Sequence, residues 1–310
     1  MKLAWTAGLA ATVSLIAVGA YAQGQPDFSK VEIKTTPLGH GLFMLEGNGG
    51  NITVACGQDG YIQVDGEFAP LHDKIKAAVD RACGGKQIKY LVNTHFHGDH
   101  TGGNAGFAQD GAQIVAHENL KLRLEHGSSN GLSGAKTAAV SGGMLPAKTY
   151  TTEGIQLMVE GQSAFVNHPK SAHTDTDSYV YFPAADVIST GDVVSTGNRY
   201  VTIDYANGGS INGIISTVET YIRMGDDQTK YVPGHGELTN KAGVQRYHDL
   251  LVRVRDAVQG EIKSGKTEAQ AISDHPLAQI GAELHTNQMA DDNMVKMVYR
   301  SLKGVKANKA

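Results

Sequence analysis

The sequence predicts an α/β fold in which two sheets face each other and helices cover them. Short β-rich runs alternate with segments of helical spacing, an order typical of sheets covered by helices. The β-then-α pattern occurs twice, which indicates two similar halves. Beyond residue 236 only helical patterns follow, so we expect a helical C-terminal region.

The first 22 residues have the pattern of a secretory signal peptide. Lys2 is their only charged residue, an apolar run covers residues 3–18, and the small residues Ala20 and Ala22 fit a cleavage site. The run is shorter than the roughly 20 residues that a membrane-spanning helix needs, which disfavours an uncleaved anchor. We expect cleavage after Ala22, a periplasmic location without stable membrane insertion, and a single domain over residues 23–310.

The composition excludes several classes of protein. The 310 residues include 41% hydrophobic residues and carry a formal net charge of -4. Such a chain can bury a core, so it is not disordered, and it lacks the basic surface that nucleic-acid binders usually show. The expected partner is a small-molecule substrate, and the oligomeric state stays open.

Cys56 and Cys83 are the two cysteines of the chain. Cys56 ends a β-rich run and Cys83 ends a helical one, and the pattern alone does not place their Cα atoms within bridging distance. A disulfide, which an oxidising compartment permits, and two free buried thiols therefore both remain open.

The first half of the chain is expected to begin with a strand meander at residues 31–33, 42–45, 52–55 and 61–64. The glycine-rich hairpin at residues 46–51 is expected to be mobile. Helical spacing at residues 70–82 precedes two expected strands, at 88–92 and 112–116, and a helix at 118–125.

The second half starts after a long loop, residues 126–146, which is rich in Gly, Ser and Ala and lacks any period. We expect strands at residues 155–159, 163–167, 178–182, 187–190 and 231–233, and helices at 211–224, 241–263, 268–273 and 287–302. In the last helix we attribute the spacing of Met289, Met294 and Met297 to core packing rather than to a cofactor site.

The strongest functional signal follows the expected strand at residues 88–92, where a His-x-His-x-Asp-His pattern runs from His95 to His100. Alternate side chains of an extended segment share a side, so His95 and His97 can reach one cation. Asp99 and His100, beyond Gly98, can point to a second. Burying four such groups without a cation is costly, which disfavours ordinary core or surface histidines.

This pattern resembles the HxHxDH motif of the metallo-β-lactamase superfamily. Later segments resemble further motifs of that family in the expected order: a Ser-Ala-His-Thr-Asp segment with His173, a Thr-Gly-Asp segment with Asp192, and a Pro-Gly-His-Gly segment with His235. An earlier Val-Asp-Gly segment with Asp65 resembles the opening motif. The resemblance covers nearly all of the chain beyond the signal peptide and implies a four-layer αβ/βα sandwich.

The resemblance also implies a centre of two Zn²⁺ ions. His95, His97 and His173 would hold the first, Asp99, His100 and His235 the second, and Asp192 would bridge them. Two cations lower the pKa of a shared water, and Asp99 is the expected catalytic residue because it would orient the resulting hydroxide and shuttle its proton. Asp65 and Thr94 either support these ligands or are plain cap and turn residues.

The remaining histidines carry weaker signals. His168 stands in a turn-like Asn-His-Pro context, so we interpret it as a turn residue rather than a ligand. His117, at the start of a helix, and His40, between glycines, are expected at most to line the cleft without binding metal.

Departures from the family's patterns bear on the substrate. Asp192 stands where one subclass of zinc β-lactamases has a cysteine ligand, and Ser195 stands where that subclass has a substrate-anchoring lysine. The bridging aspartate resembles instead glyoxalase II and the acyl-homoserine lactonases, although the periplasm is the wrong compartment for a glutathione thioester. His97 stands where flavodiiron relatives have glutamate, which disfavours redox use.

We therefore expect a zinc-dependent hydrolase that opens a cyclic amide, with a β-lactam as the leading substrate class and a lactone or thioester as the alternative. A non-catalytic periplasmic zinc-binding protein is the alternative of another class, although zinc storage does not require a bridging carboxylate. Expected substrate contacts are the hairpin 47–51, the loop 128–146 and residues 198–200, where Arg199 would hold a carboxylate and Tyr200 an oxyanion.

Overall fold

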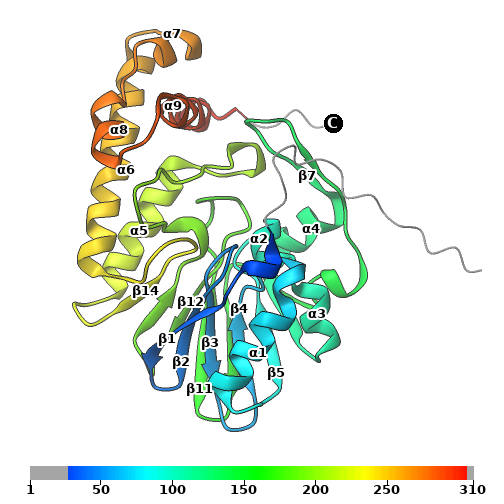
Figure 1. Cartoon of the computed structure of the whole chain (residues 1–310). Coiled ribbons are helices and arrows are strands. Elements are labelled where there is room, and N and C mark those ends of the chain that lie inside the picture. Colours follow the sequence, from blue (N-terminus) through cyan, green and yellow to red (C-terminus); the bar gives the residue numbers. More distant parts are fainter. Residues whose placement is uncertain (1–26, 306–310) are drawn as a thin grey trace, which may run out of the picture.

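The computed structural model describes residues 27–305, so the expected signal peptide lies outside the described residues. The described chain has four layers, with helices on the outer face of each of two packed sheets (Figure 1). The C-terminal residues form further helices above one end of the sheets. The predicted α/β sandwich with a helical C-terminal region is confirmed. No helix between residues 27 and 305 has the length and hydropathy to cross a membrane.

The first sheet contains seven strands. In sheet order they are β1 (Lys34–Gly39), β2 (Leu42–Glu46), β3 (Ile52–Cys56), β4 (Tyr61–Val64), β5 (Ile88–Val92), β6 (Gln113–His117) and β9 (Lys148–Tyr150). The first four form the predicted antiparallel meander, and the last three add in parallel. The expected first strand at residues 31–33 is wrong, because the residues that pair with β2 begin at Lys34.

Three helices pack beside this sheet. They are α1 (His72–Cys83), α3 (Asn104–Gln109) and α4 (Glu118–His126). The loop at residues 126–146 is irregular as predicted, apart from the two-residue strands β7 (Ser128–Ser129) and β8 (Lys136–Thr137) and a short 3-10 turn at Gly142–Met144.

The second sheet contains six strands that follow chain order. They are β10 (Ile155–Val159), β11 (Gln162–Asn167), β12 (Tyr179–Phe182), β13 (Val187–Ser189), β14 (Lys230–Val232) and β15 (Thr239–Asn240). Helix α5 (Ile211–Met224) is the crossover that joins the parallel pair β13 and β14.

Alternating side chains build the layers. In β4, Tyr61 faces the core beneath α1, whereas Ile62 and Val64 face the core between the sheets, where Val180 and Phe182 of β12 meet them. All five are at least 98% buried, and each such apolar side chain contributes roughly 1.5–3 kcal/mol to the free energy of unfolding. The two-residue period of the sequence is therefore what sets the sheets face to face.

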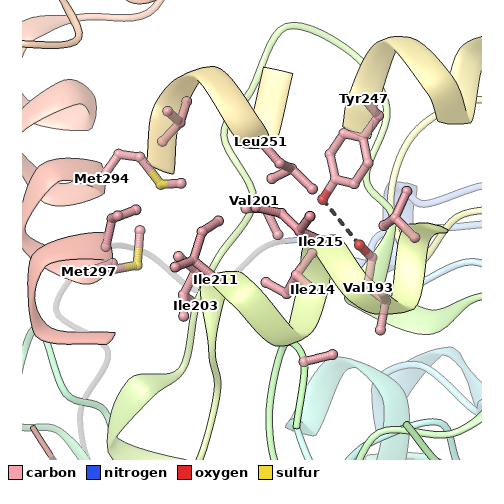
Figure 2. Packing of buried hydrophobic residues seen from close by; sticks show 14 of the residues in the cluster. Val193, Val201, Ile203, Ile211, Ile214, Ile215, Tyr247, Leu251, Met294 and Met297 are labelled. Atoms are coloured by element: carbon pink, nitrogen blue, oxygen red, sulfur yellow. Dashed lines mark hydrogen bonds between the residues drawn. The ribbon is translucent and has the colours of Figure 1, made fainter. Parts of the chain in front are cut away.

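The C-terminal region consists of α6 (Lys241–Lys263), α7 (Glu268–Ser273), α8 (Ala278–Leu284) and α9 (Gln288–Leu302). Figure 2 shows Met294 and Met297 directed toward the core around Ile203 and Ile211, as predicted, whereas Met289 is 73% exposed, so its assignment to the core is wrong. The hydroxyl of Tyr247 in α6 donates to the carbonyl of Val193 at 3.2 Å.

Cys56 and Cys83 form a disulfide with a Cα–Cα distance of 5.3 Å, which ties the end of β3 to the end of α1. Replacing both cysteines by serine is expected to lower the free energy of unfolding by about 3–4 kcal/mol, because the bridge closes a long loop in the unfolded chain. Urea unfolding of the oxidised protein and of the double variant measures this. Equal unfolding midpoints would show that the bridge adds no stability.

Candidate metal centre

The seven predicted ligand residues lie at one edge of both sheets, beyond the carboxyl ends of their strands. The short helix α2 (Gly98–Thr101), which carries Asp99 and His100, follows β5, and Asp192 and His235 follow the parallel strands β13 and β14. His173 lies in the loop between β11 and β12. Loops at the carboxyl ends of parallel strands meet at one edge, so segments far apart in the sequence converge there.

The first group consists of His95, His97, His173 and Asp192, whose ligand atoms all lie within 4.8 Å of one another. The His97 Nδ1 atom lies 3.1 Å from Nε2 of His95 and 3.1 Å from Nε2 of His173. The Asp192 Oδ2 atom lies 3.8 Å and 3.7 Å from the same two nitrogens. Three imidazoles and a carboxylate around one point match the donor set of zinc.

The second group consists of Asp99, His100 and His235. The Asp99 Oδ2 atom lies 3.2 Å from Nε2 of His235 and 3.7 Å from Nε2 of His100. Asp192 also faces this group, since its Oδ1 atom lies 3.1 Å from Nε2 of His100. One carboxylate therefore stands between the two groups, as the sequence predicts for a bridging ligand.

Whether a cation fits this centre can be judged from two of its buried polar atoms. His100 Nε2 and Asp192 Oδ1 are buried, and no well-aligned hydrogen bond reaches either atom, although the two lie 3.1 Å apart. Buried polar atoms are rarely left unpaired in proteins, because losing their contact with water is costly. A divalent cation between these atoms satisfies both, so the donor set fits a metal.

The opposite ring nitrogen of most ligand histidines has a partner that fixes the ring. These contacts are Thr94 Oγ1 at 3.1 Å from His95 Nδ1, Asp204 Oδ2 at 3.0 Å from His97 Nε2, Asp65 Oδ2 at 2.8 Å from His100 Nδ1, and the Thr202 carbonyl at 2.7 Å from His173 Nδ1. Such partners select the tautomer that leaves the other nitrogen free for a metal. Asp204 was not predicted, because it lies outside every motif.

Asp65 and Thr94, for which two interpretations were open, both support the ligands. Asp65 accepts hydrogen bonds from the backbone amide and the hydroxyl of Thr94, at 2.8 Å and 2.7 Å, besides its contact with His100. Gly191 beside Thr94 has a φ of +53°, and a Cβ atom there would lie 2.8 Å from the Thr94 hydroxyl. Only glycine therefore fits this position of the Thr-Gly-Asp segment.

The hairpin at residues 46–51 contacts both loops that carry ligand residues of the second group. Its amides donate to the carbonyls of both ligand loops, from Gly50 to Asp99 at 3.0 Å and from Asn51 to Gly234 at 2.7 Å. A Cβ atom at Gly50 would lie 2.1 Å from the His100 ring. The hairpin is thus held in contact with one side of the second group, and glycine is required at position 50 for this close approach.

Glu67, which was not predicted either, holds the tip of this hairpin. It is fully buried, and its Oε2 atom accepts from the amides of Asn48 and Gly49 at 3.0 Å and 2.8 Å. Burial raises the pKa of this carboxyl group, and the two amides oppose that rise.

Replacing Glu67 by alanine is expected to weaken cation binding at the second group about 10- to 100-fold. The hairpin that packs against Asp99 and His100 would lose the hydrogen bonds that hold its tip. Titration with Co²⁺, followed by its absorption bands, measures each group's affinity. Glu46→Ala is the matched control, since Glu46 lies on the same hairpin but pairs with Lys34. Unchanged affinity in the Glu67 variant would contradict this role.

The charges of the metal-free centre favour protonated imidazoles in the second group. Burial lowers the pKa of His100, but the carboxylates of Asp192, Asp65 and Asp99 outweigh it and raise that pKa well above its usual value. Burial also opposes the rise at His235, whose pKa its hydrogen bonds to Asp192 and Asp99 bring to about 9. Against burial, His100 and His235 bring the pKa of Asp99 down to about 2.

Cation binding at neutral pH is therefore expected to release protons, since a protonated imidazole must lose its proton before it binds metal. Apparent affinity should rise with pH until His235 has titrated near pH 9. Calorimetric titration with Zn²⁺ at pH 7, in buffers of different ionisation enthalpy, measures the release. The same binding enthalpy in every buffer would refute it.

Other predicted residues lie outside the two groups. His117 stacks on His168 with ring centroids 3.6 Å apart, and His40 lies in the turn between β1 and β2, at the opposite end of the sheet from the ligand loops. The Tyr200 hydroxyl donates to Asp291 Oδ1 at 2.9 Å, so the expectation that it holds an oxyanion is not supported.

Comparison with protein families matches residues 44–235 to the metallo-beta-lactamase superfamily. Subunit alpha of 2,4-dinitroanisole O-demethylase from Nocardioides sp. (strain JS1661) is 29% identical over 182 residues, which cover 58% of this chain and 50% of that protein. Hydroxyacylglutathione hydrolase from Nitrosococcus oceani is 28% identical over 221 residues, which cover 69% of this chain and 72% of the relative. This chain therefore spans half the length of the first relative and more of the second.

Solved structures show the same fold. A metallo-beta-lactamase from Pontibacter korlensis aligns with a TM-score of 0.58 at 16% identity, covering 71% of this chain and 99% of that one. A double mutant of the sec-alkyl sulfatase PisA1 aligns with a TM-score of 0.65 at 15% identity, covering 91% of this chain and 52% of that one. At such low identity the likeness shows the fold alone.

Proposed function

Since this chain belongs to the metallo-β-lactamase superfamily, whose members are metal-dependent hydrolases, we propose that it hydrolyses a small substrate at two zinc ions. The observation that carries this proposal is the position of Asp192 between the two ligand groups. Storage of zinc does not require a carboxylate shared between two groups, whereas a pair of cations that act on one substrate is well served by a ligand that faces both. A hydrolase is therefore a better explanation of the site than a zinc carrier.

The side chains of the centre divide into a closed face and an open one. His95, His100 and His173 are at most 1% exposed, whereas the side chains of His97, Asp99 and His235 are 25% to 28% exposed. A substrate is therefore expected to approach over the open face.

When bound, two zinc ions would supply a water of lowered pKa and polarise the bond to be cleaved. Asp99 lies on the open face, so it can accept a proton from the attacking water and pass it to the leaving group. Asp204 and Asp65 keep the rings of His97 and His100 in position meanwhile.

For the substrate we propose a cyclic amide of the β-lactam kind, as the sequence analysis favours, with a thioester as second candidate. The second candidate is supported by the resemblance to hydroxyacylglutathione hydrolase from Nitrosococcus oceani, which covers 72% of that protein. A lactone shares the carbonyl chemistry of both.

A panel of nitrocefin, a lactone and a thioester, tested against zinc-loaded, chelated and reloaded protein, checks this proposal. We expect turnover of at least one compound, its loss with chelator and its return with zinc. If no member of the panel is hydrolysed while zinc stays tightly bound, the result would support the zinc-carrier alternative instead.

We also propose that the protein is exported. Support comes from the signal-like pattern of the first 22 residues and from the bridge between Cys56 and Cys83, because disulfides persist mainly in oxidising compartments. N-terminal sequencing of protein from a periplasmic fraction should begin at Gln23. Recovery of the chain only from the cytoplasm, with residues 1–22 attached, would refute export.

A further inference from the structure

The ring of His97 is turned opposite to the rings of the other two histidines of the first group. His95 and His173 present Nε2 to the group, whereas His97 presents Nδ1, and its Nε2 atom faces Asp204 Oδ2 at 3.0 Å. Asp204 is 7% exposed, and its two oxygens accept from the side-chain amide of Asn207 at 2.9 Å and 2.8 Å. A chain of polar contacts thus leads from Asn207 through Asp204 to a predicted ligand.

We propose that Asn207 is a positioning residue for the first ligand group. It fixes the Asp204 carboxylate, and Asp204 in turn holds His97 in the orientation and tautomer that leave Nδ1 free for a cation. Contacts of this kind around a metal ligand set its orientation and basicity. Asn207 ends the 3-10 turn Tyr205–Asn207 and is 3% exposed, so water has little access to its contacts. The inference rests on the proposed metal centre and deepens it.

Arg123 of α4 decides which way the side-chain amide of Asn207 points. Its Nη1 atom donates to Asn207 Oδ1 at 3.1 Å. A guanidinium group has donors and no acceptor, so it must face the amide oxygen, and the NH₂ group must then face Asp204. The guanidinium is itself held by Asp175, to which its Nε and Nη2 atoms donate at 3.1 Å and 2.6 Å. Two such bonds to one carboxylate fix the plane of the guanidinium.

The neighbours of position 207 require an amide there. The side chain must offer an acceptor to Arg123 and a donor to Asp204, and its second NH₂ hydrogen can reach the Ser129 carbonyl, which lies 3.0 Å from Nδ2. An aspartate would place a second carboxylate against Asp204, and an apolar side chain would leave the buried Asp204 carboxylate without this donor. The polar atoms of the side chain thus have partners that suit an asparagine.

The backbone of the turn is held independently of this side-chain amide. The backbone amide of Asn207 donates to the Asp204 carbonyl at 2.9 Å. Arg300 of α9 donates from Nη1 to the hydroxyl of Tyr205 at 2.6 Å and pairs with Glu268 of α7. Removing the side chain of Asn207 should therefore leave the turn in place and allow the Asp204 carboxylate to rotate.

The cation affinities of Asn207→Ala test this inference. We expect binding at the first group to weaken about tenfold, with the affinity of the second group unchanged. Titration with Co²⁺, followed by its absorption bands, measures both affinities. Asn167→Ala is the matched control, since the Asn167 amide contacts Phe165 of its own strand at 3.5 Å. Equal weakening at both groups would reveal a general loss of stability and would contradict the inference.

Variants of Arg123 test the same role without changing Asn207. Arg123→Met should weaken the first group in the same way by a smaller factor. Arg123→Lys should recover part of the loss, because its amine can still donate to Asn207 Oδ1. Lys121→Met is the control on the same helix, where it removes a cation that pairs with Glu125, and it should bind cations as wild type does. Affinity equal to wild type in Arg123→Met would show that Arg123 does not orient the amide.

Measurements on the metal-free protein separate this inference from the proposed function. Nitrogen NMR of the imidazole rings should show a proton on His97 Nε2 that exchanges slowly with water in wild type. In Asn207→Ala this exchange should be about tenfold faster or more, because Asp204 no longer holds the ring firmly. That difference would uphold the positioning role even if neither group bound a cation, a result that would count against the metal centre. An unchanged His97 signal, or unchanged affinity of the first group in a variant that binds both cations, would overturn the role of Asn207.

Discussion

Replacing Asp99 by alanine is expected to lower kcat about a thousandfold or more while the protein keeps at least one cation. Asp99 contributes to the second group only, whereas the first group consists of His95, His97, His173 and Asp192. General acid–base catalysis typically contributes 10²–10⁴-fold, and the loss of a ligand to the second cation adds to that cost.

Turnover of the best substrate of the panel, together with elemental analysis of the purified variant, measures both parts of this prediction. Asp73→Ala is a suitable control, because its side chain is 98% exposed and lies on α1 rather than at the centre. Turnover within a few-fold of wild type would remove Asp99 from the mechanism. Loss of all bound metal would instead show that the two groups do not bind cations separately.

Replacing Asp192 by asparagine is expected to have a still larger effect, because this carboxylate faces both groups. An amide offers one oxygen and one NH₂ group. One of the two ligand groups would therefore face an NH₂ group in place of the carboxylate oxygen that can bind its cation. We expect fewer than two cations per chain and a loss of kcat of about a thousandfold or more. No well-aligned hydrogen bond reaches its Oδ1 atom, so the fold should survive the change.

Metal analysis and turnover of Asp192→Asn, with circular dichroism as a check of folding, measure this. Asp175→Asn serves as the matched control, since Asp175 pairs with Arg123 at 2.6 Å and belongs to neither ligand group. Two tightly bound cations and near-normal turnover in the Asp192 variant would show that this carboxylate does not join the groups.

The candidate ligand residues could be predicted from the sequence, whereas some of the residues that hold them in place could not. Each ligand is part of a short motif, and motifs at the ends of strands converge because the sheets bring those ends to one edge. Asp204 and Glu67 belong to no such motif. Asp204 meets His97 across 107 positions of the sequence, a pairing that only the folded chain reveals.

In the fold, too, some elements could be predicted from the sequence and others could not. Long periodic segments such as α5 and α6 have the predicted bounds, because an amphipathic face is repeated over many turns. The strands β9 and β15 and the helices α3 and α8 were not predicted, since two to seven residues carry too little pattern. The first strand was misplaced because pairing with β2 decides its start. Tyr200 was misjudged because its partner, Asp291, comes from a distant helix.

The paired centre is tested most directly by an anomalous difference map, recorded at the zinc absorption edge from crystals of zinc-loaded protein. We predict two peaks about 3.5–4 Å apart, one among His95, His97 and His173, the other among Asp99, His100 and His235, with Asp192 between them. A single peak at saturating zinc, or peaks remote from these side chains, would contradict a two-metal centre.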